Sequence, residues 1–458
     1  MSTASSSLYV PPAVLPPEKP HWFIGQLIRT LRNQIEGWPK TVFEADSYRP
    51  PIPRAPLFIM HPDAIKTVLL DDADNFPQGE LFKRIMRPVW GKGLLPSEGK
   101  AWKWQRNASS HAFRPADMTS MAQHVSDVAQ AAIDNLSASQ ATAPVDIDAE
   151  MTKVTFDVII NTLLSGATDF SRAEMQEQLR GLLADISKPK LSYFFASDAY
   201  HANQPDIISS YTKPLLNSLK TMVRRRRSAP PAGDLVDLLL KARDPETDRG
   251  LDDDLMADNL LGFIMAGHET TARTLTWALF LVATHPKTAD RILDEVISVA
   301  GGQAMGADHV SRLIFTRQVI SEAQRLYPGA FQLTRVAQRD TILAGETVAA
   351  GTRIIIPTYA LHRHKKYWTN PHSFDPDRFA PDADKPNRYI YLPFGGGPRI
   401  CLGAAFAMME AVTILGTFIR SAEFDVDPAH HVWPLARAAL NPKGGMPMTV
   451  TRRVQCFE

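Results

Sequence analysis

The segment from residue 251 to residue 286 constrains the fold of this 458-residue chain more than any other. It reads LDDDLMADNLLGFIMAGHETTARTLTWALFLVATHP, with aspartates that can cap a helix at its start and Pro286 at its end. A helix of about 30 residues is roughly 45 Å long, enough to cross a domain. Polar residues inside the run, among them His268, Glu269 and Arg273, argue against a membrane span. The segment therefore predicts one long helix through the interior of the protein.

The rest of the chain is predicted to be helical with one short exception. Helical periodicity dominates residues 100–325. Residues 333–357 are rich in β-branched side chains interrupted by glycines, which indicates a small antiparallel sheet. A proline-rich lead-in over residues 1–60 contains a strand at 55–61, and a short helix follows from Pro62. We expect a mainly α fold with a minor antiparallel β region.

Composition excludes several classes of function. The net charge of +1 gives no reason to expect a nucleic acid partner. The N-terminus has neither the basic nor the apolar region of a signal peptide, and no apolar run approaches the roughly 18 residues of a membrane anchor. Two cysteines, Cys401 and Cys456, are typical of a cytoplasmic protein, although their spacing leaves a disulfide between them open. The run Arg224–Arg227 is either a solvated helix end or a patch that binds a partner.

The stretch YLPFGGGPRICLGAAFAMME, residues 391–410, places one of the two cysteines between a glycine loop and an apolar helix. A thiol at the start of a helix lies where the helix dipole and free N–H groups stabilise thiolate. Three glycines let the backbone approach a flat group closely, Gly403 removes a side chain on the same side, and Arg399 can pair with an anion. Taken alone, such a cysteine is either an inert residue or a metal ligand.

The complete pattern decides between these two readings. Phe394, Gly397, Arg399, Cys401 and Gly403 form F-x-x-G-x-R-x-C-x-G without a mismatch. This resembles the haem-binding loop of the cytochrome P450 family. The resemblance implies that Cys401 is the proximal thiolate ligand of the iron in haem b, with Phe394 packed beside it, and that the haem lies between the long central helix and the cysteine loop.

The long helix carries a second motif of the same family. Ala266, Gly267, Glu269 and Thr270 match A-G-x-[DE]-T, and Ala266 shares a helical face with Thr270. The resemblance implies that Glu269 and Thr270 deliver protons during oxygen activation, with Glu269 facing a water path. Considered without the family, Glu269 is equally well a surface acid and Thr270 a threonine that bends the helix.

Two further constellations match the family pattern. Glu322 and Arg325 lie one helical turn apart, and Arg378 follows in FDPDRF, which implies a buried structural cluster. Trp102 and Arg106 match the W-x-x-x-R helix. The resemblance implies that both reach the haem propionates together with Arg335 and Arg399.

The resemblance covers essentially the whole chain, so we expect one cytochrome P450 domain over residues 1–458. No flavin or iron–sulfur module follows the cysteine motif, which implies that electrons come from NAD(P)H through a separate ferredoxin or flavodoxin and its reductase. Lys100 and Lys103 are then either part of the docking surface for that donor or a solvated face. The expected protein is a monomeric, cytoplasmic monooxygenase that hydroxylates an apolar, fatty-acid-like substrate. A peroxygenase that uses hydrogen peroxide and a non-catalytic haem-thiolate sensor are the alternatives.

Overall fold

The computed structural model describes residues 8–17, 23–114, 118, 121–138, 143–165, 171–186, 188, 192, 196–205 and 209–453. The α-helices are α1 Phe23–Arg32, α2 Pro62–Lys66, α3 Glu80–Trp90, α4 Gly99–Ser110, α6 Ala122–Ala138, α7 Ile147–Leu164, α8 Arg172–Ile186, α10 Asp198–Ala202, α11 Thr212–Ser228, α12 Leu235–Lys241, α13 Asp253–Ala283, α14 Pro286–Ala300, α15 Ala307–Arg312, α16 Ile314–Leu326, α17 Thr358–Leu361 and α18 Ala404–Ser421. The strands are β1 Ser47–Tyr48, β2 Leu57–Ile59, β3 Val145–Asp146, β4 Leu333–Val336, β5 Thr341–Leu343, β6 Glu346–Val348, β7 Arg353–Ile356, β8 Ala422–Val426, β9 Pro434–Ala436, β10 Leu440–Pro442 and β11 Pro447–Arg452. The mainly α prediction is confirmed.

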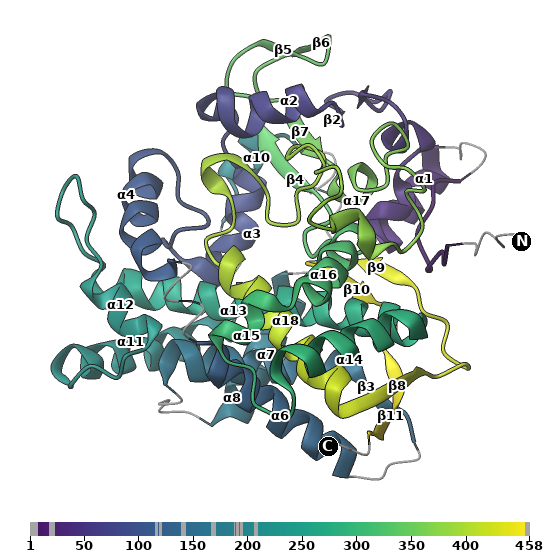
Figure 1. The fold of residues 1–458 in the computed structure, drawn as a ribbon. Helices are drawn as coiled ribbons and strands as arrows, with labels where there is room; N and C mark the ends of the chain where they lie inside the picture. Colours follow the sequence, from purple (N-terminus) through teal and green to yellow (C-terminus); the bar gives the residue numbers. More distant parts are fainter. Residues whose placement is uncertain are drawn as a thin grey trace, which may run out of the picture.

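Helix α13 is the long helix that the sequence predicts, and it runs through the middle of the molecule (Figure 1). Asp252 caps its start by accepting a hydrogen bond of 2.8 Å from the Leu255 N–H, and Pro286 begins the next helix. Nearly all of its residues from Leu255 to Val282 are buried. A Cβ on Gly267 would come within 2.7 Å of Ile159 Cδ1, so this glycine allows α7 to approach α13 closely.

The sheet next to the helical body is mixed. Its strand order is β1-β2-β7-β4, in which β4 and β7 are antiparallel but β2 and β7 are parallel. The antiparallel pairing expected over residues 333–357 is confirmed, and the sequence did not predict the parallel pairing of β7 with β2, which lies some 300 residues earlier in the chain. The hairpin β5–β6 is antiparallel and projects from the top of the molecule (Figure 1).

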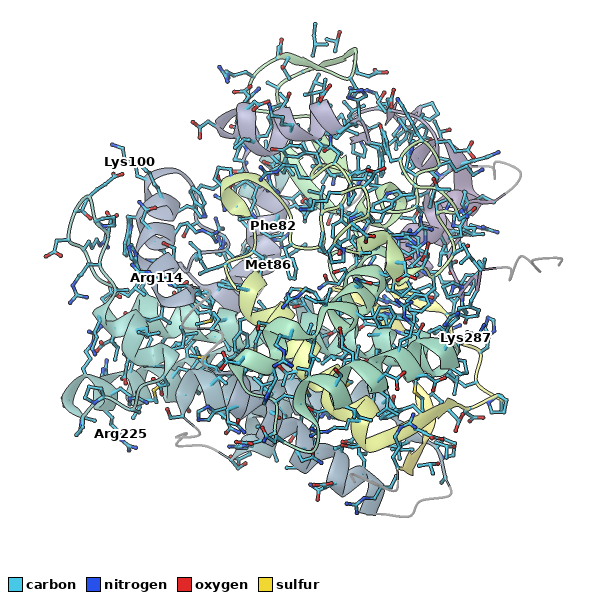
Figure 2. All side chains as sticks on the ribbon, viewed as in Figure 1. Phe82, Met86, Lys100, Arg114, Arg225 and Lys287 are labelled. Carbon is cyan, nitrogen blue, oxygen red and sulfur yellow. The ribbon has the colours of Figure 1, made fainter. Side chains whose placement is uncertain are left out.

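The arginine run at the end of α11 is a largely exposed helix end, as one of the two readings of the sequence expects, but it also makes ion pairs that the sequence did not predict. Arg226 is almost buried and donates hydrogen bonds of 2.7 and 2.6 Å to Asp234 and Asp237, which lie at the start of α12. Arg227 pairs with Asp253 at 2.7 Å, at the start of α13. The run therefore ties three helices together, with Arg225 at the edge of the molecule (Figure 2).

Among the described residues, one helix is long and apolar enough to cross a membrane by composition, namely α18. Most of that helix is buried inside the protein, packed against α6, α13 and α14. The other cysteine of the sequence, Cys456, and with it the disulfide left open above, lies outside the described residues.

Candidate active site

A cavity of about 1380 Å³ lies between α13, the cysteine loop, β4 and α3. The residues predicted from the sequence to bind a cofactor or to act in catalysis all line this cavity: Trp102, Arg106, Ala266, Glu269, Thr270, Arg335, Phe394, Arg399, Cys401 and Gly403. These residues are contributed by α4, α13, β4 and the loop that ends at Gly403, just before α18. The fold thus brings together residues that are up to 301 positions apart in the sequence.

The cysteine loop reaches the cavity through glycines in left-handed conformations. Gly395 and Gly397 have φ angles of +74° and +66°, which are strained for any residue with a side chain. A Cβ on Gly397 would also overlap the carbonyl oxygen of Leu69. The loop is closed by a hydrogen bond of 2.9 Å from the Cys401 N–H to the Phe394 carbonyl. These constraints fix the position of the Cys401 thiol.

Cys401 is exposed where it lines the cavity, and protein surrounds the rest of its side chain. Burial raises its pKa, and this outweighs the lowering by the Gly403 N–H group and by the positive charge of Arg106. The N–H group at the helix start thus lowers the pKa of the thiol, as the sequence predicts, but burial opposes this effect. A thiol in this position becomes thiolate when it coordinates a metal cation, since coordination deprotonates it outright.

The cavity is lined by the three arginines that the sequence predicts to bind the cofactor, namely Arg106, Arg335 and Arg399. Burial, together with the nearby charge of Arg399, lowers the pKa of Arg335 to about 10. Arg399 donates a hydrogen bond of 2.7 Å to the Ser97 carbonyl, lies over the Trp102 ring and pairs with Glu98 at 3.4 Å. One carboxylate, Glu98, thus faces several buried cations, and a ligand with two carboxylates would correct this imbalance.

The space in front of Gly403 also fits a large flat group. A Cβ on this glycine would meet no atom of the described residues within 4 Å, so the start of α18 faces open cavity. Haem b requires a metal ligand, room for its ring and partners for its propionates. The site offers a thiol that lines the cavity, an open face at Gly403 and arginines at the edge. The residues present therefore fit this cofactor.

Thr270 and Ala266 line the cavity from α13. The Thr270 hydroxyl donates a hydrogen bond of 2.7 Å to the Ala266 carbonyl, one turn earlier in the helix. Its lone pairs remain available to accept a hydrogen bond from a group inside the cavity. The Thr270 hydroxyl can therefore accept one hydrogen bond from a group in the cavity while it keeps its own hydrogen bond to the helix backbone.

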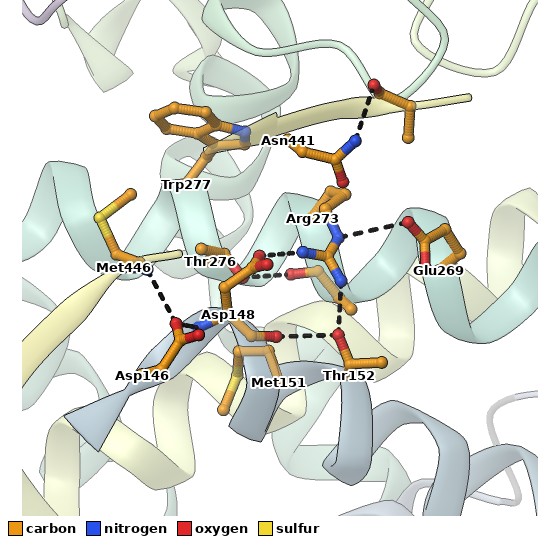
Figure 3. Close-up of polar contacts among 12 residues, drawn as sticks. Asp146, Asp148, Met151, Thr152, Glu269, Arg273, Thr276, Trp277, Asn441 and Met446 are labelled. Carbon is orange, nitrogen blue, oxygen red and sulfur yellow. Dashed lines mark hydrogen bonds and ion pairs between the residues drawn. The ribbon is translucent and has the colours of Figure 1, made fainter. Parts of the chain in front are cut away.

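Glu269 lies in an ion-pair network that the sequence did not predict (Figure 3). Its Oε1 atom is 3.6 Å from Nε of Arg273, one turn further along α13. Arg273 also pairs with Asp148 and donates a hydrogen bond to the Thr152 hydroxyl, both on α7. The expectation that Glu269 simply faces a water path is incomplete, because a fixed cation stands beside it.

The cluster of Glu322, Arg325 and Arg378 forms away from the cavity. Arg325 donates two hydrogen bonds of 2.7 Å to the carboxylate of Glu322, and both side chains are fully buried. Arg378 approaches the same carboxylate at 3.4 Å. The sequence spacing thus predicted a geometry that the structure contains.

Much of the remaining wall of the cavity is apolar, and it is formed by α3 together with residues between 27 and 58. Phe82 and Met86 of α3 line the cavity and are labelled near the centre of the view in Figure 2. The start of α3 is capped from another segment, because Asp198 of α10 accepts hydrogen bonds of 2.6 Å from the Glu80 N–H and 3.4 Å from the Leu81 N–H.

The two lysines considered for a docking surface lie on α4 at the edge of the molecule. Lys100 is exposed there (Figure 2). Lys103 pairs with Glu246 at 2.9 Å, and both side chains are more than half exposed. The pair reduces the positive charge that Lys103 can offer to another protein.

Comparison with known proteins gives consistent matches. The family model described as cytochrome P450 matches residues 15–447. Cytochrome P450 132 of Mycobacterium tuberculosis is 30% identical over 86% of this chain and 87% of its own length. Cyclooctat-9-en-7-ol 5-monooxygenase of Streptomyces melanosporofaciens is 31% identical over 78% of this chain and 77% of its own length. Cytokinin hydroxylase of Arabidopsis thaliana is 29% identical over 79% of this chain and 72% of its own length. Two of these relatives are named for oxygenation of quite different molecules.

Proposed function

The chain belongs to the cytochrome P450 family, and from this premise we propose that it is a haem-thiolate monooxygenase acting on an apolar substrate. The reaction transfers one oxygen atom of O2 into a C–H bond of that substrate. One observation carries the proposal: Cys401 and the Glu269–Thr270 pair line the same cavity, whose surface is mostly apolar. A cavity of this kind suits an apolar molecule held by a few polar groups.

Cys401 is the proposed ligand of haem iron, and Arg106, Arg335 and Arg399 are the proposed partners of the propionates, with Trp102 beside them. When bound, haem supplies the chemistry of dioxygen activation, and its thiolate ligand favours cleavage of the O–O bond. The protein contributes a rigid loop that presents the thiol and an excess of buried cations that orients the cofactor. We propose that residues 1–458 form one such domain.

Thr270 and Glu269 are the proposed proton-handling residues. The Thr270 hydroxyl accepts a hydrogen bond inside the cavity while it donates its own to Ala266. Glu269 takes up a proton from water and passes it into the cavity, then returns to its carboxylate form. Removing this relay should leave substrate binding intact and divert electrons into hydrogen peroxide.

The substrate class rests on the lining of the cavity. Phe82, Ile85, Met86 and Phe263 supply apolar and aromatic surface, which favours a long apolar chain such as that of a fatty acid. The test is a panel of fatty acids, terpenoids and steroids, each screened for the spectral shift of haem on binding. A shift with the terpenoids or steroids, and none with fatty acids, would overturn the fatty-acid preference.

Turnover separates the three candidate functions. The monooxygenase should consume NAD(P)H steadily with a ferredoxin or flavodoxin and its reductase, in proportion to the hydroxylated product. Product formation with hydrogen peroxide alone, and none with the redox partners, would favour the peroxygenase. Ligand binding without product under either condition would favour the sensor. A monomeric state and a cytoplasmic location remain predictions, which sedimentation and cell fractionation can test.

A further inference from the structure

The guanidinium group of Arg273 is held from one side only. Its terminal nitrogens pair with Asp148 and donate to the Thr152 hydroxyl, both on α7 (Figure 3). Its Nε–H points along α13 toward Glu269 but stands 3.6 Å from the nearest carboxylate oxygen. Among the residues that the structure describes, this buried Nε has no hydrogen-bond partner. Arg273 is therefore fixed at one end and unsatisfied at the other.

The α7 side of the network is rigid. Asp148 lies in the first turn of α7 and accepts a further hydrogen bond of 3.2 Å from the Thr276 hydroxyl of α13. Burial raises the pKa of Asp148, while the charge of Arg273 lowers it. The Asp148 carboxylate and the Arg273 guanidinium therefore stay paired, because separating them would leave two buried charges without partners.

The Glu269 side is loose by comparison. A buried donor without an acceptor is unfavourable, so the Nε–H group of Arg273 favours any approach of the Glu269 carboxylate. The observed separation shows that this approach is not complete. Glu269 also lines the cavity, so its side chain lies between the Arg273 guanidinium and the cavity.

We propose that Arg273 is a positioning residue that holds the Glu269 carboxylate between turnovers and releases it for proton transfer. The inference rests on the proposed function and deepens it. A proton from water neutralises Glu269, which weakens its attraction to Arg273. The neutral side chain turns to the cavity and gives the proton up there. The carboxylate that remains is recaptured by Arg273, so one proton enters and one leaves in each cycle.

The charges that face this network come from three elements. Asp148 lies on α7 and Asp146 on the neighbouring β3. His268 lies on α13 itself, where burial lowers its pKa and its Nδ1 contacts the Ile264 carbonyl at 2.7 Å. Asp148 is thus the group that competes with Glu269 for Arg273. Its removal should turn the cation wholly toward Glu269.

Two variants should therefore act in opposite directions. In Asp148→Asn, Glu269 is the remaining carboxylate in contact with Arg273 and is held more tightly. We expect about threefold more hydrogen peroxide per NAD(P)H, the factor that one additional ion pair of ordinary strength would give. We also expect a larger solvent deuterium isotope effect. In the double variant Asp148→Asn/Arg273→Gln the clamp is gone, and no carboxylate remains at position 148 to be left without Arg273. Peroxide should then stay at or below the level of the unmodified protein.

A second measurement does not depend on turnover. A double-mutant cycle of Glu269→Gln and Arg273→Gln, followed by denaturant unfolding of the holoprotein, gives the coupling between the two side chains. The coupling should rise about threefold, as an equilibrium factor, when the cycle is repeated in the Asp148→Asn background. Arg273→Lys, which keeps the charge but lacks Nε–H, should restore part of it.

Two results would overturn the proposal. If both turnover variants change peroxide formation in the same direction, Arg273 and Asp148 act only by supporting the fold. If the cycle gives no coupling, Glu269 is not held. Failure of the monooxygenase assay would refute the proposed function while leaving the coupling measurement intact, so the two failures are distinguishable.

Discussion

Replacing Arg325 by methionine should prevent the protein from accumulating in a folded, haem-loaded form. The Arg325 guanidinium makes five hydrogen bonds: two to Glu322 and one each to the carbonyls of His362, Pro371 and Ser373. Both partners of the ion pair are fully buried. The substitution leaves one carboxylate and three carbonyls without this donor. Breaking a buried pair in this way costs about 3–5 kcal/mol, against a total stability of roughly 5–15 kcal/mol for a whole protein.

The size of the effect is checked by removing the stranded charge. In Glu322→Gln/Arg325→Met the buried carboxylate is neutral, so the double variant should regain stability relative to Arg325→Met. Arg378 keeps its hydrogen bond of 2.8 Å to the Asn370 carbonyl in both variants. Soluble yield, haem content per chain and urea midpoints of the two variants give the comparison. A single variant that is as stable as the double would refute the reasoning, since it would show that the stranded carboxylate carries no cost.

Four shorter predictions follow from the site and the core. Gly397→Ala forces a side chain into the Leu69 carbonyl at a positive φ, so haem incorporation measured by absorbance should drop sharply. Cys401→Ser should abolish the thiolate spectrum of the reduced carbon monoxide complex while far-ultraviolet circular dichroism stays unchanged. Thr270→Ala should raise hydrogen peroxide per electron consumed, and unchanged coupling would contradict its role. Burial lowers the pKa of His362 to about 3 from about 6.5, so the unfolded chain binds the extra proton and stability falls as pH drops through that window. His362→Gln keeps an acceptor for the backbone N–H that His362 now binds at 2.8 Å and should flatten this acid limb in urea titrations.

Local sequence signals predicted α13 well because its determinants are local. Asp252 caps the start, Pro286 ends the region, and the apolar side chains between them need no partner to be recognised. The same holds for Gly397, whose role depends on its own φ angle. The residues that line the cavity were predicted from motifs that resemble those of the family, because each motif is a short local pattern that can be recognised before the fold is known.

The network around Glu269 could not be read from the sequence because its members are far apart. Asp148 lies 125 positions before Arg273, and nothing in the intervening residues marks them as partners. The parallel pairing of β2 with β7 was missed for the same reason. The pKa of Cys401 depends on how much protein surrounds the thiol, which a helix-start pattern does not report. One signal was present for Arg273, namely a cation four residues after an acid in an otherwise apolar helix.

The cap that Asp198 provides for α3 joins two segments whose ends meet over the cavity. When α10 moves away, the Glu80 and Leu81 N–H groups lose their acceptor and the first turn of α3 begins to fray, at about 1 kcal/mol for the cap. Opening of this wall is therefore a small helix-melting event rather than a rigid swing. Amide hydrogen exchange at these two positions would count the openings directly, even while no substrate is present.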